Sequence, residues 1–193
     1  MSSPQDLTAI ADFTDILDGL GIRYAVGGSM ASSAYGIVRF TADADVAVEP
    51  FDDKADKLFD ALKSGYYISK EAMWDALRLR GSFNIIHLES AFKIDVFISG
   101  DTAYDRHIIA RRKSLKLSEA MEKPFWVVSP EDIVLLKLRW YQAGQCGSER
   151  QWNDILGILT VQADKLDFEY IGKWADILAL KELLIKAVQQ AKG

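Results

Sequence analysis

A double glycine between a predicted strand and a predicted helix, within residues 22–48, is the feature that most limits what this chain can fold into. The run IRYAV is typical of a short strand, GGS follows it, and Ser29 is placed to cap a brief helix that ends near Tyr35. The run ADVAV then predicts a second strand, which Pro50 ends. Strand, helix and strand in this order predict a mixed α/β core.

The spacing of apolar residues predicts the remaining elements. A helix is expected over 6–20, and a second helix over 52–64 is followed by the strand YYIS and the helix KEAMWDALRLR. The runs SFNIIHLE and FKIDVFIS are expected to pair as antiparallel strands, with a helix near 101–112 and the strand FWVVS after them. From Pro130 onward, PEDIVLLKLRWYQA, ERQWNDILGILTVQ and the stretch that begins at Phe168 have helical patterns. The expected fold class is α+β.

Length and charge limit the number of domains and the kind of partner. The chain has 193 residues and a formal charge of −5, which suits one compact domain or a core with a small helical extension. Because the pattern becomes helical from Pro130, we expect a core over 1–129 and a helical part over 130–193 packed on it. The acidic balance argues against a broad phosphate-binding surface, although residues 106–116 carry five Lys and Arg residues and no acid. That segment fits either a local anionic partner or a solvated helix face followed by a strand.

Neither a targeting segment nor a membrane-spanning segment is expected. The N-terminal run MSSPQDLTAIADF lacks the basic start and apolar stretch of a signal peptide, and no apolar run approaches the roughly 20 residues that span a bilayer. The single cysteine, Cys146, has no partner for an internal disulfide, which fits a reducing compartment. We therefore expect a cytoplasmic protein.

Three aspartates indicate metal-dependent chemistry. Side chains two residues apart on a strand share a face, so Asp43 and Asp45 project together and favour a divalent cation such as Mg²⁺. Asp95 lies in the apolar run FKIDVFI, where an unpaired carboxylate is costly and needs a partner. If its strand lies beside that of the other two, the three carboxylates suffice for two ions about 3.5–4 Å apart. The alternative for the acid pair is an exposed strand face.

The double glycine supplies the complementary half of a phosphate-binding site beside the acids. Between a strand and a helix, Gly27 and Gly28 let backbone N–H groups approach a phosphate chain, and Ser29 adds a hydroxyl. The turn, the acid pair and the third acid together predict phosphate binding beside a metal. Arg39 and Thr41, shortly before the acids, fit either residues that orient the metal loop or residues that satisfy a turn.

In this order, VGGS, DADV and KIDV resemble the signature of the polymerase beta-like nucleotidyltransferase superfamily, over the core to about residue 99. The resemblance implies a nucleotidyltransferase-like mixed β-sheet flanked by helices, with a helical C-terminal part. It also implies a nucleoside triphosphate such as ATP, two Mg²⁺ ions that Mn²⁺ can replace, and Asp43, Asp45 and Asp95 as catalytic metal ligands. Ala44, between the paired acids, is smaller than the residue usual in the family.

The helical part resembles bacterial nucleotidyltransferases related to the abortive-infection toxins of type IV toxin-antitoxin systems. SPEDIVLLKLRW matches an Asp-x4-Lys helix through Asp132 and Lys137, and ERQWNDILGIL matches an Arg-x3-Asp helix through Arg150 and Asp154. The resemblance implies that both helices face the nucleotide, with Lys137 and Arg150 on the triphosphate. Gly157 stands where such toxins often carry another aspartate.

Nucleotidyl transfer is the function that these motifs favour. The toxin resemblance implies that the acceptor is RNA, such as a tRNA, or a protein, and that an antitoxin protein is a further partner. One alternative is a small-molecule acceptor, as in aminoglycoside-modifying enzymes, and another is a nucleotide-binding module without turnover. A metal-dependent phosphohydrolase that uses the same acids is a third alternative.

Overall fold

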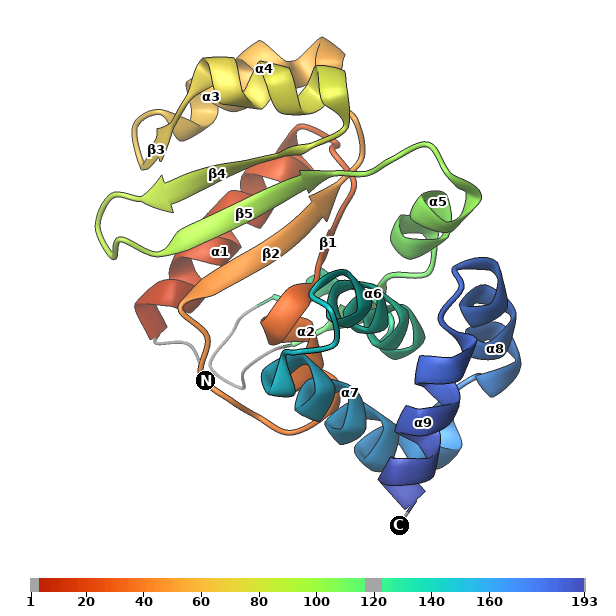
Figure 1. The fold of residues 1–193 in the computed structure, drawn as a ribbon. Helices are drawn as coiled ribbons and strands as arrows, with labels where there is room; N and C mark the ends of the chain where they lie inside the picture. Colours follow the sequence, from red (N-terminus) through yellow and green to blue (C-terminus); the bar gives the residue numbers. More distant parts are fainter. Residues whose placement is uncertain (1–3, 117–122, 193) are drawn as a thin grey trace.

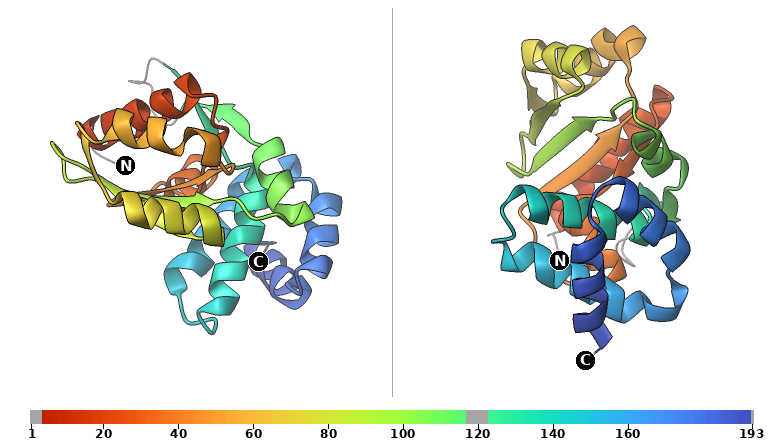
Figure 2. Two further views of the ribbon diagram at one scale, coloured as in Figure 1. Left: turned by 90° about the horizontal axis from the view of Figure 1, so that it is seen from above. Right: turned by 45° about the vertical axis from the view of Figure 1, so that its right-hand side comes forward.

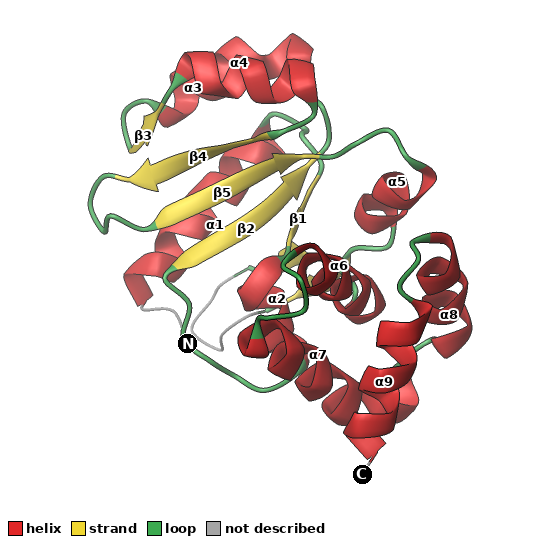
Figure 3. Ribbon diagram, in the orientation of Figure 1, coloured by secondary structure: helices red, strands yellow, loops and turns green. Residues whose placement is uncertain are grey.

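The computed structural model describes residues 4–116 and 123–192, in which seven strands form one mixed sheet (Figures 1 and 3). From edge to edge the order is β3 (Tyr66–Ile68), β4 (Ser82–His87), β5 (Lys93–Ile98), β2 (Asp43–Val48), β1 (Tyr24–Val26), β7 (Phe125–Val127) and β6 (Lys113–Leu115). The pairs β2–β5 and β1–β7 are parallel, and the other pairs are antiparallel. The predicted α+β class is confirmed, as is the antiparallel pairing of β4 with β5.

The central strands β2 and β5 separate an apolar face of the sheet from a polar face. Val46 and Val96, which are partners in register, are fully buried on the apolar face. Three helices cover this face: α1 (Pro4–Gly19), α3 (Ala55–Leu62) and α4 (Lys70–Leu79). Helix α1 lies behind the sheet in Figure 1, where Phe13 packs on Tyr66 of β3 with ring centroids 6.4 Å apart. The apolar half of the alternating pattern therefore forms the main core.

The remaining helices lie at the other side of the sheet, below or to the right of β2 and β1 in Figure 1, and Figure 2 shows the same grouping from two further directions. They are α2 (Gly28–Tyr35), α5 (Ala103–Ala110), α6 (Pro130–Ala143), α7 (Glu149–Gln162), α8 (Phe168–Ile177) and α9 (Lys181–Lys192). Short 3-10 turns lie at Asp52–Lys54 and Ala163–Lys165. Helix α6 begins as predicted, because Pro130 needs no N–H partner there and the Ser129 hydroxyl accepts from the Asp132 N–H at 3.2 Å.

Two elements differ from the expectation. The final helical stretch is split into α8 and α9, because Ala179 adopts a left-handed φ of 57° and Leu180 turns inward, where 1% of it is exposed. The helix near 101–112 already ends at Ala110, and the chain continues into β6. None of the helices in the described ranges is long and apolar enough to cross a bilayer. The division between residues 129 and 130 stays a prediction.

Candidate functional site

Four charged side chains lie on the polar face of β2 and β5, two on each strand. The strands are parallel, and their register places Asp43 beside Lys93 and Asp45 beside Asp95. Neighbouring strands lie about 4.8 Å apart and side chains two residues apart share a face, so these four residues surround one small area. The expected adjacency of the strands that carry the three aspartates is therefore confirmed.

The carboxylate of Asp45 is partly buried and lies beside two other acids. Burial raises the pKa of Asp45 to about 6, and the carboxylates of Asp43 and Asp95 add to this effect, whereas Lys137 and Lys93 oppose it. The ionised form of Asp45 is thus held beside two other acids in partly dehydrated surroundings. A cation bound at this point would stabilise it.

The glycine turn lies directly against Asp45. A β-carbon on Gly28 would stand 1.7 Å from the Oδ2 atom of Asp45, and the φ of +52° at Gly28 is one that other residues rarely adopt. The Gly27 N–H donates to the carbonyl oxygen of Asp45 at 2.8 Å. Only a glycine at position 28 lets the start of α2 approach the strand this closely.

Ser29 does not cap α2, so that prediction is wrong. The helix already begins at Gly28, its N-cap is Gly27, and no side chain accepts from its first N–H groups. The Ser29 hydroxyl instead accepts a hydrogen bond from the Nη2 atom of Arg39. The first turn of α2 therefore keeps backbone N–H groups that no side-chain cap occupies.

Two of the three aspartates have partners within the protein. The Nζ atom of Lys93 lies 2.7 Å from Oδ2 of Asp95, and the Thr41 hydroxyl donates to Oδ1 of Asp43 at 2.9 Å. Across residues 4–116 and 123–192, no three His, Cys, Asp or Glu side chains form a group that could hold a metal ion. The aspartates share one face but do not form a ready-made cage of three carboxylates.

A network of ion pairs joins the loop before β2 to helices α6 and α7. Arg39 donates through Nε and Nη2 to the two carboxylate oxygens of Asp154, at 2.9 and 3.0 Å. The Nζ atom of Lys137 donates to Oδ2 of Asp154 at 2.7 Å and to Oε1 of Gln151 at 2.9 Å. Asp154 therefore holds an arginine and a lysine at once, and the fork of the arginine fits its carboxylate in a bidentate way.

Burial sets the energetics of this network. Only 5% of the Lys137 side chain and 7% of the Asp154 side chain are exposed. Burial acts to raise the pKa of Asp154, but the hydrogen bonds from Arg39 and Lys137 outweigh it and lower the pKa. Burial lowers the pKa of Lys137, and the hydrogen bond to Asp154 opposes this shift. Each residue therefore stabilises the charged form of the other.

Two glycines allow the loop to reach α7. A β-carbon on Gly36 would stand 2.9 Å from the backbone nitrogen of Ile158, and one on Gly157 would stand 3.2 Å from the backbone nitrogen of Ile37. A side chain at Gly36 would force the backbone of α7 to shift, and one at Gly157 would press on the loop at Ile37. The glycine at 157, where the resemblance suggested an aspartate, thus has a steric role that brings Arg39 to Asp154.

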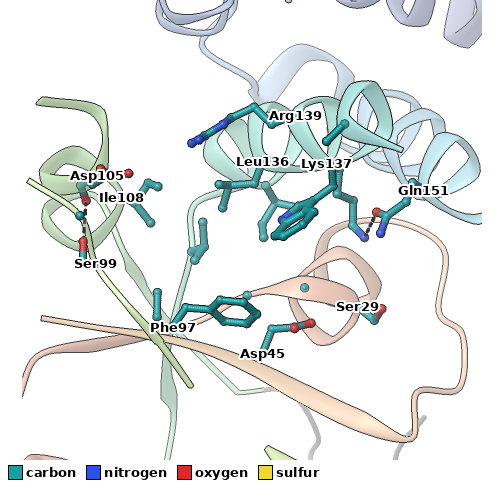
Figure 4. A pocket seen from close by; sticks show the side chains of 18 of the residues that line it. Ser29, Asp45, Phe97, Ser99, Asp105, Ile108, Leu136, Lys137, Arg139 and Gln151 are labelled. Carbon is teal, nitrogen blue, oxygen red and sulfur yellow. Dashed lines mark hydrogen bonds between the residues drawn. The ribbon is translucent and has the colours of Figure 1, made fainter. Parts of the chain in front are cut away.

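A cavity of about 540 Å³ lies between the polar face of the sheet and α6 (Figure 4). One end contains five residues that the sequence predicted: Gly27, Gly28, Ser29, Asp45 and Lys137. Ser99 and Asp105 lie at the opposite end in Figure 4, and the apolar side chains of Phe97 and Leu136 lie between the two ends. The lining also includes Trp140, Gly100 and Arg139. The cavity combines an apolar wall with polar groups at both ends, as small-molecule sites commonly do.

Other predicted site residues lie outside the lining of this cavity. The lining does not include Asp43, Asp95, Arg39 or Asp154. Each of these residues lies next to a residue that does line the cavity. Arg150 is exposed and does not line it.

Asp132 does not have the position that the resemblance implied. It is fully buried and accepts hydrogen bonds from the hydroxyls of Ser129 and Tyr170, both at 2.7 Å. It does not line the cavity, so it stabilises the start of α6 rather than facing a nucleotide.

Sequence reasoning missed several lining residues whose spacing identifies them. Gln151 lies three residues before Asp154 on α7, and Trp140 lies three residues after Lys137 on α6. Residues three apart share a helix face, so Lys137, which lines the cavity, pointed to Trp140. Gln151 is held at the cavity by its hydrogen bond with the same lysine.

Basic residues of the segment 106–116 are partly used within the fold. The Arg111 guanidinium lies 3.9 Å from the centre of the Tyr170 ring and 3.4 Å from a carboxylate oxygen of Glu131. The Arg112 guanidinium lies 4.6 Å from the centre of the Trp126 ring. The segment consists of the end of α5 and the strand β6, and two of its cations have internal partners.

Comparisons with known proteins give structural neighbours only, since no protein-family model and no curated protein matches the sequence. The antibiotic-resistance protein ANT(2'')-Ia in complex with adenylyl-2''-tobramycin superposes with a TM-score of 0.59 at 15% identity, over 94% of this chain and 99% of that one. The lincosamide antibiotic adenylyltransferase LnuA, with lincomycin bound, gives 0.53 at 14%, over 83% and 98%. An antigenic nucleotidyltransferase-like protein from Paracoccidioides brasiliensis gives 0.54 at 17%, over 97% and 94%. The chain therefore has the nucleotidyltransferase fold.

Proposed function

We propose that this protein is a metal-dependent nucleotidyltransferase, which moves a nucleoside monophosphate from a nucleoside triphosphate to an acceptor hydroxyl. The observation that carries the proposal is the position of Asp45, at the cavity wall between two other aspartates and the glycine turn of α2. Acids, an uncapped helix N-terminus and a cavity in one place suit a triphosphate together with its counter-ion.

The start of α2 and Lys137 are the proposed phosphate-binding groups. The N–H groups of Gly28 and Ser29 belong to the first turn of α2, where a helix carries partial positive charge. Lys137 lines the same end of the cavity, and Asp154 holds its ammonium there. Arg39 touches both Ser29 and Asp154, so we assign it a positioning role.

Asp43 and Asp45 are the proposed ligands of a divalent cation, Mg²⁺ or Mn²⁺, with Asp95 as the third acid. Their donor set fits such an ion, because hard cations prefer carboxylate oxygens, and because burial, together with the carboxylates of Asp43 and Asp95, raises the pKa of Asp45. When bound, the cation polarises the α-phosphate and lowers the pKa of the acceptor hydroxyl. Whether a second ion binds depends on whether Lys93 releases Asp95.

The transfer makes one bond and breaks one. The acceptor oxygen bonds to the α-phosphorus, the bond from that phosphorus to the bridging oxygen breaks, and pyrophosphate leaves. We assign to Asp95 the role of taking the proton of the acceptor hydroxyl, and its position beside Asp45 on the next strand supports this role. The apolar wall at Phe97 and Trp140 offers the surface on which the base packs.

For the acceptor we propose, from the toxin resemblance, RNA such as tRNA or a protein, with an antitoxin as partner. A small molecule is the second candidate. It is favoured by the likeness to LnuA with lincomycin bound and to ANT(2'')-Ia with adenylyl-2''-tobramycin, and by the internal partners of Arg111 and Arg112, which reduce the basic surface available to RNA.

Transfer of label from each of four nucleoside triphosphates, radioactive at the α-phosphate, tests the proposal. Total RNA, the protein itself, an aminoglycoside and a lincosamide are the acceptors, with Mg²⁺ present. Labelled adduct is expected with one acceptor class and is expected to disappear in Asp45→Asn, while the surface variant Asp60→Asn retains it. Release of labelled nucleoside monophosphate without adduct would support the phosphohydrolase instead, and Mg²⁺-dependent binding without turnover would support the binding module.

A further inference from the structure

Lys93 stands inside the group of acids that the proposed function uses. It is the direct neighbour of Asp43 on the adjacent strand, and it precedes Asp95 by two residues on the same face of the sheet. Its Nζ atom lies 2.7 Å from Oδ2 of Asp95, with 41% and 24% of the two side chains exposed. A permanent cation of the protein therefore already occupies one side of this face.

The ammonium of Lys93 and a metal ion would compete for the carboxylate of Asp95, because the ammonium already lies on one of its two oxygens. A lysine ammonium has three donors and no lone pair, so it pairs with a carboxylate without ligating a metal. A divalent ion bound to Asp95 would have to displace Lys93 or lie beside it, where two positive charges repel. Asp43 and Asp45 are not paired with any lysine or arginine within hydrogen-bonding distance in the described part of the chain.

The cavity also separates Asp45 from Asp95, the acid that pairs with Lys93. Asp45 lines the cavity, whereas Asp95 does not. The described residues include no group of three acids arranged to hold a metal. This is expected if the carboxylate of Asp95 is turned toward Lys93 and away from the other two acids.

We propose that Lys93 takes the place of a second metal ion, so that this site binds one divalent cation, at Asp43 and Asp45. The inference rests on the proposed function and narrows it. Lys93 is a positioning residue: its ammonium holds Asp95 beside the acceptor and supplies one of the two positive charges that the acids would otherwise take from solution. Replacing Lys93 by an uncharged side chain of similar length is then expected to open the second position.

Counting bound Mn²⁺ tests the inference without relying on activity. The full chain is titrated with Mn²⁺ by equilibrium dialysis, alone and with non-transferable α,β-methylene analogues of the four nucleoside triphosphates, and electron paramagnetic resonance is recorded. Two Mn²⁺ ions about 4 Å apart give a spin-coupled spectrum, and a single ion gives an uncoupled one. The wild type is expected to bind one uncoupled ion, and Lys93→Met is expected to bind two coupled ions.

Lys63→Met is the matched control, because Lys63 forms an exposed 2.7 Å pair with Asp60 far from the site. It is expected to bind one uncoupled ion, like the wild type. Circular dichroism and thermal melting establish that each variant is folded, and Lys93→Gln repeats the test with a polar side chain.

Two coupled ions in the wild type overturn the inference, because Lys93 then releases Asp95. A single ion in both Lys93→Met and Lys93→Gln overturns it as well, because something other than Lys93 then limits the site. A wild type that binds no Mn²⁺ with any analogue overturns the proposed function itself, which is a different result from either of these.

Discussion

Two lysine–aspartate pairs with the same 2.7 Å separation lie at this site, and they differ in burial. The side chains of Lys137 and Asp154 are 5% and 7% exposed, whereas those of Lys93 and Asp95 are 41% and 24% exposed. A buried pair has lost the hydration of both charges, so each charge needs the other, while an exposed pair keeps much of its water. Equal geometry thus conceals unequal energies: the buried pair stabilises the fold, and the open pair changes what the site can bind.

The variant Asp154→Ala tests the difference between the two pairs most directly. It leaves the buried Lys137 ammonium and the Arg39 guanidinium without their shared carboxylate, so we expect the free energy of unfolding to fall by about 3–5 kcal/mol. Urea denaturation followed by tryptophan fluorescence measures this value. A loss below about 1 kcal/mol would show that water replaces the carboxylate and that the pair is not truly buried.

Gly157→Leu separates the partners without removing a charge. The new side chain meets the backbone of Ile37, which pushes the loop that carries Arg39 away from α7, and overpacking of this kind costs about 1–3 kcal/mol. Gly172→Leu is the matched control, because a β-carbon at Gly172 in α8 meets no atom within 4 Å. The steric account fails if both variants unfold at the same urea concentration as the wild type.

Lys137→Met tests the buried pair from its other side. Asp154 keeps its bidentate contact with Arg39, so we expect a loss of only about 1–2 kcal/mol, less than for Asp154→Ala. The affinity for a triphosphate analogue, measured by titration calorimetry, is expected to fall about tenfold because a charged hydrogen bond to phosphate is lost. Unchanged affinity would remove Lys137 from the proposed phosphate-binding groups.

The smallest effect is expected for Lys93→Met. Exposed ion pairs contribute little, so the free energy of unfolding is expected to change by less than about 0.5 kcal/mol. Urea denaturation at low and at high salt checks this, because any contribution from the open pair shrinks as salt screens it. A loss comparable to that of Asp154→Ala would mean that burial does not distinguish the two pairs.

The strand face that carries the acids could be predicted because strand periodicity is a local property. Residues two apart share a face, and this placed Asp43 with Asp45 and marked Asp95 as an acid in need of a partner. The same rule applied to Lys93 would have identified that partner, which lies two residues earlier on the same strand. The partner of Asp95 was not predicted because only acids were considered as its neighbours.

The contact between Arg39 and Asp154 could not be read from spacing. The two residues are 115 positions apart, and they meet because Gly36 and Gly157 let a loop approach a helix closely. The positions implied for Asp132 and Arg150 came from the family resemblance alone. The structure buries Asp132 of α6 beside Tyr170 of α8, where these two helices pack together, and it leaves Arg150 exposed near the start of α7.

The cavity has one further consequence, because its polar end is made of residues from two layers. Asp45 belongs to the sheet and Lys137 to the helices that pack over it, so a ligand that touches both binds only while the layers are together. Folding and ligand binding are therefore linked equilibria. Each tenfold increase of ligand above its dissociation constant raises the free energy of unfolding by about 1.4 kcal/mol. The midpoint of thermal unfolding should then rank the nucleotides by affinity before any acceptor is known.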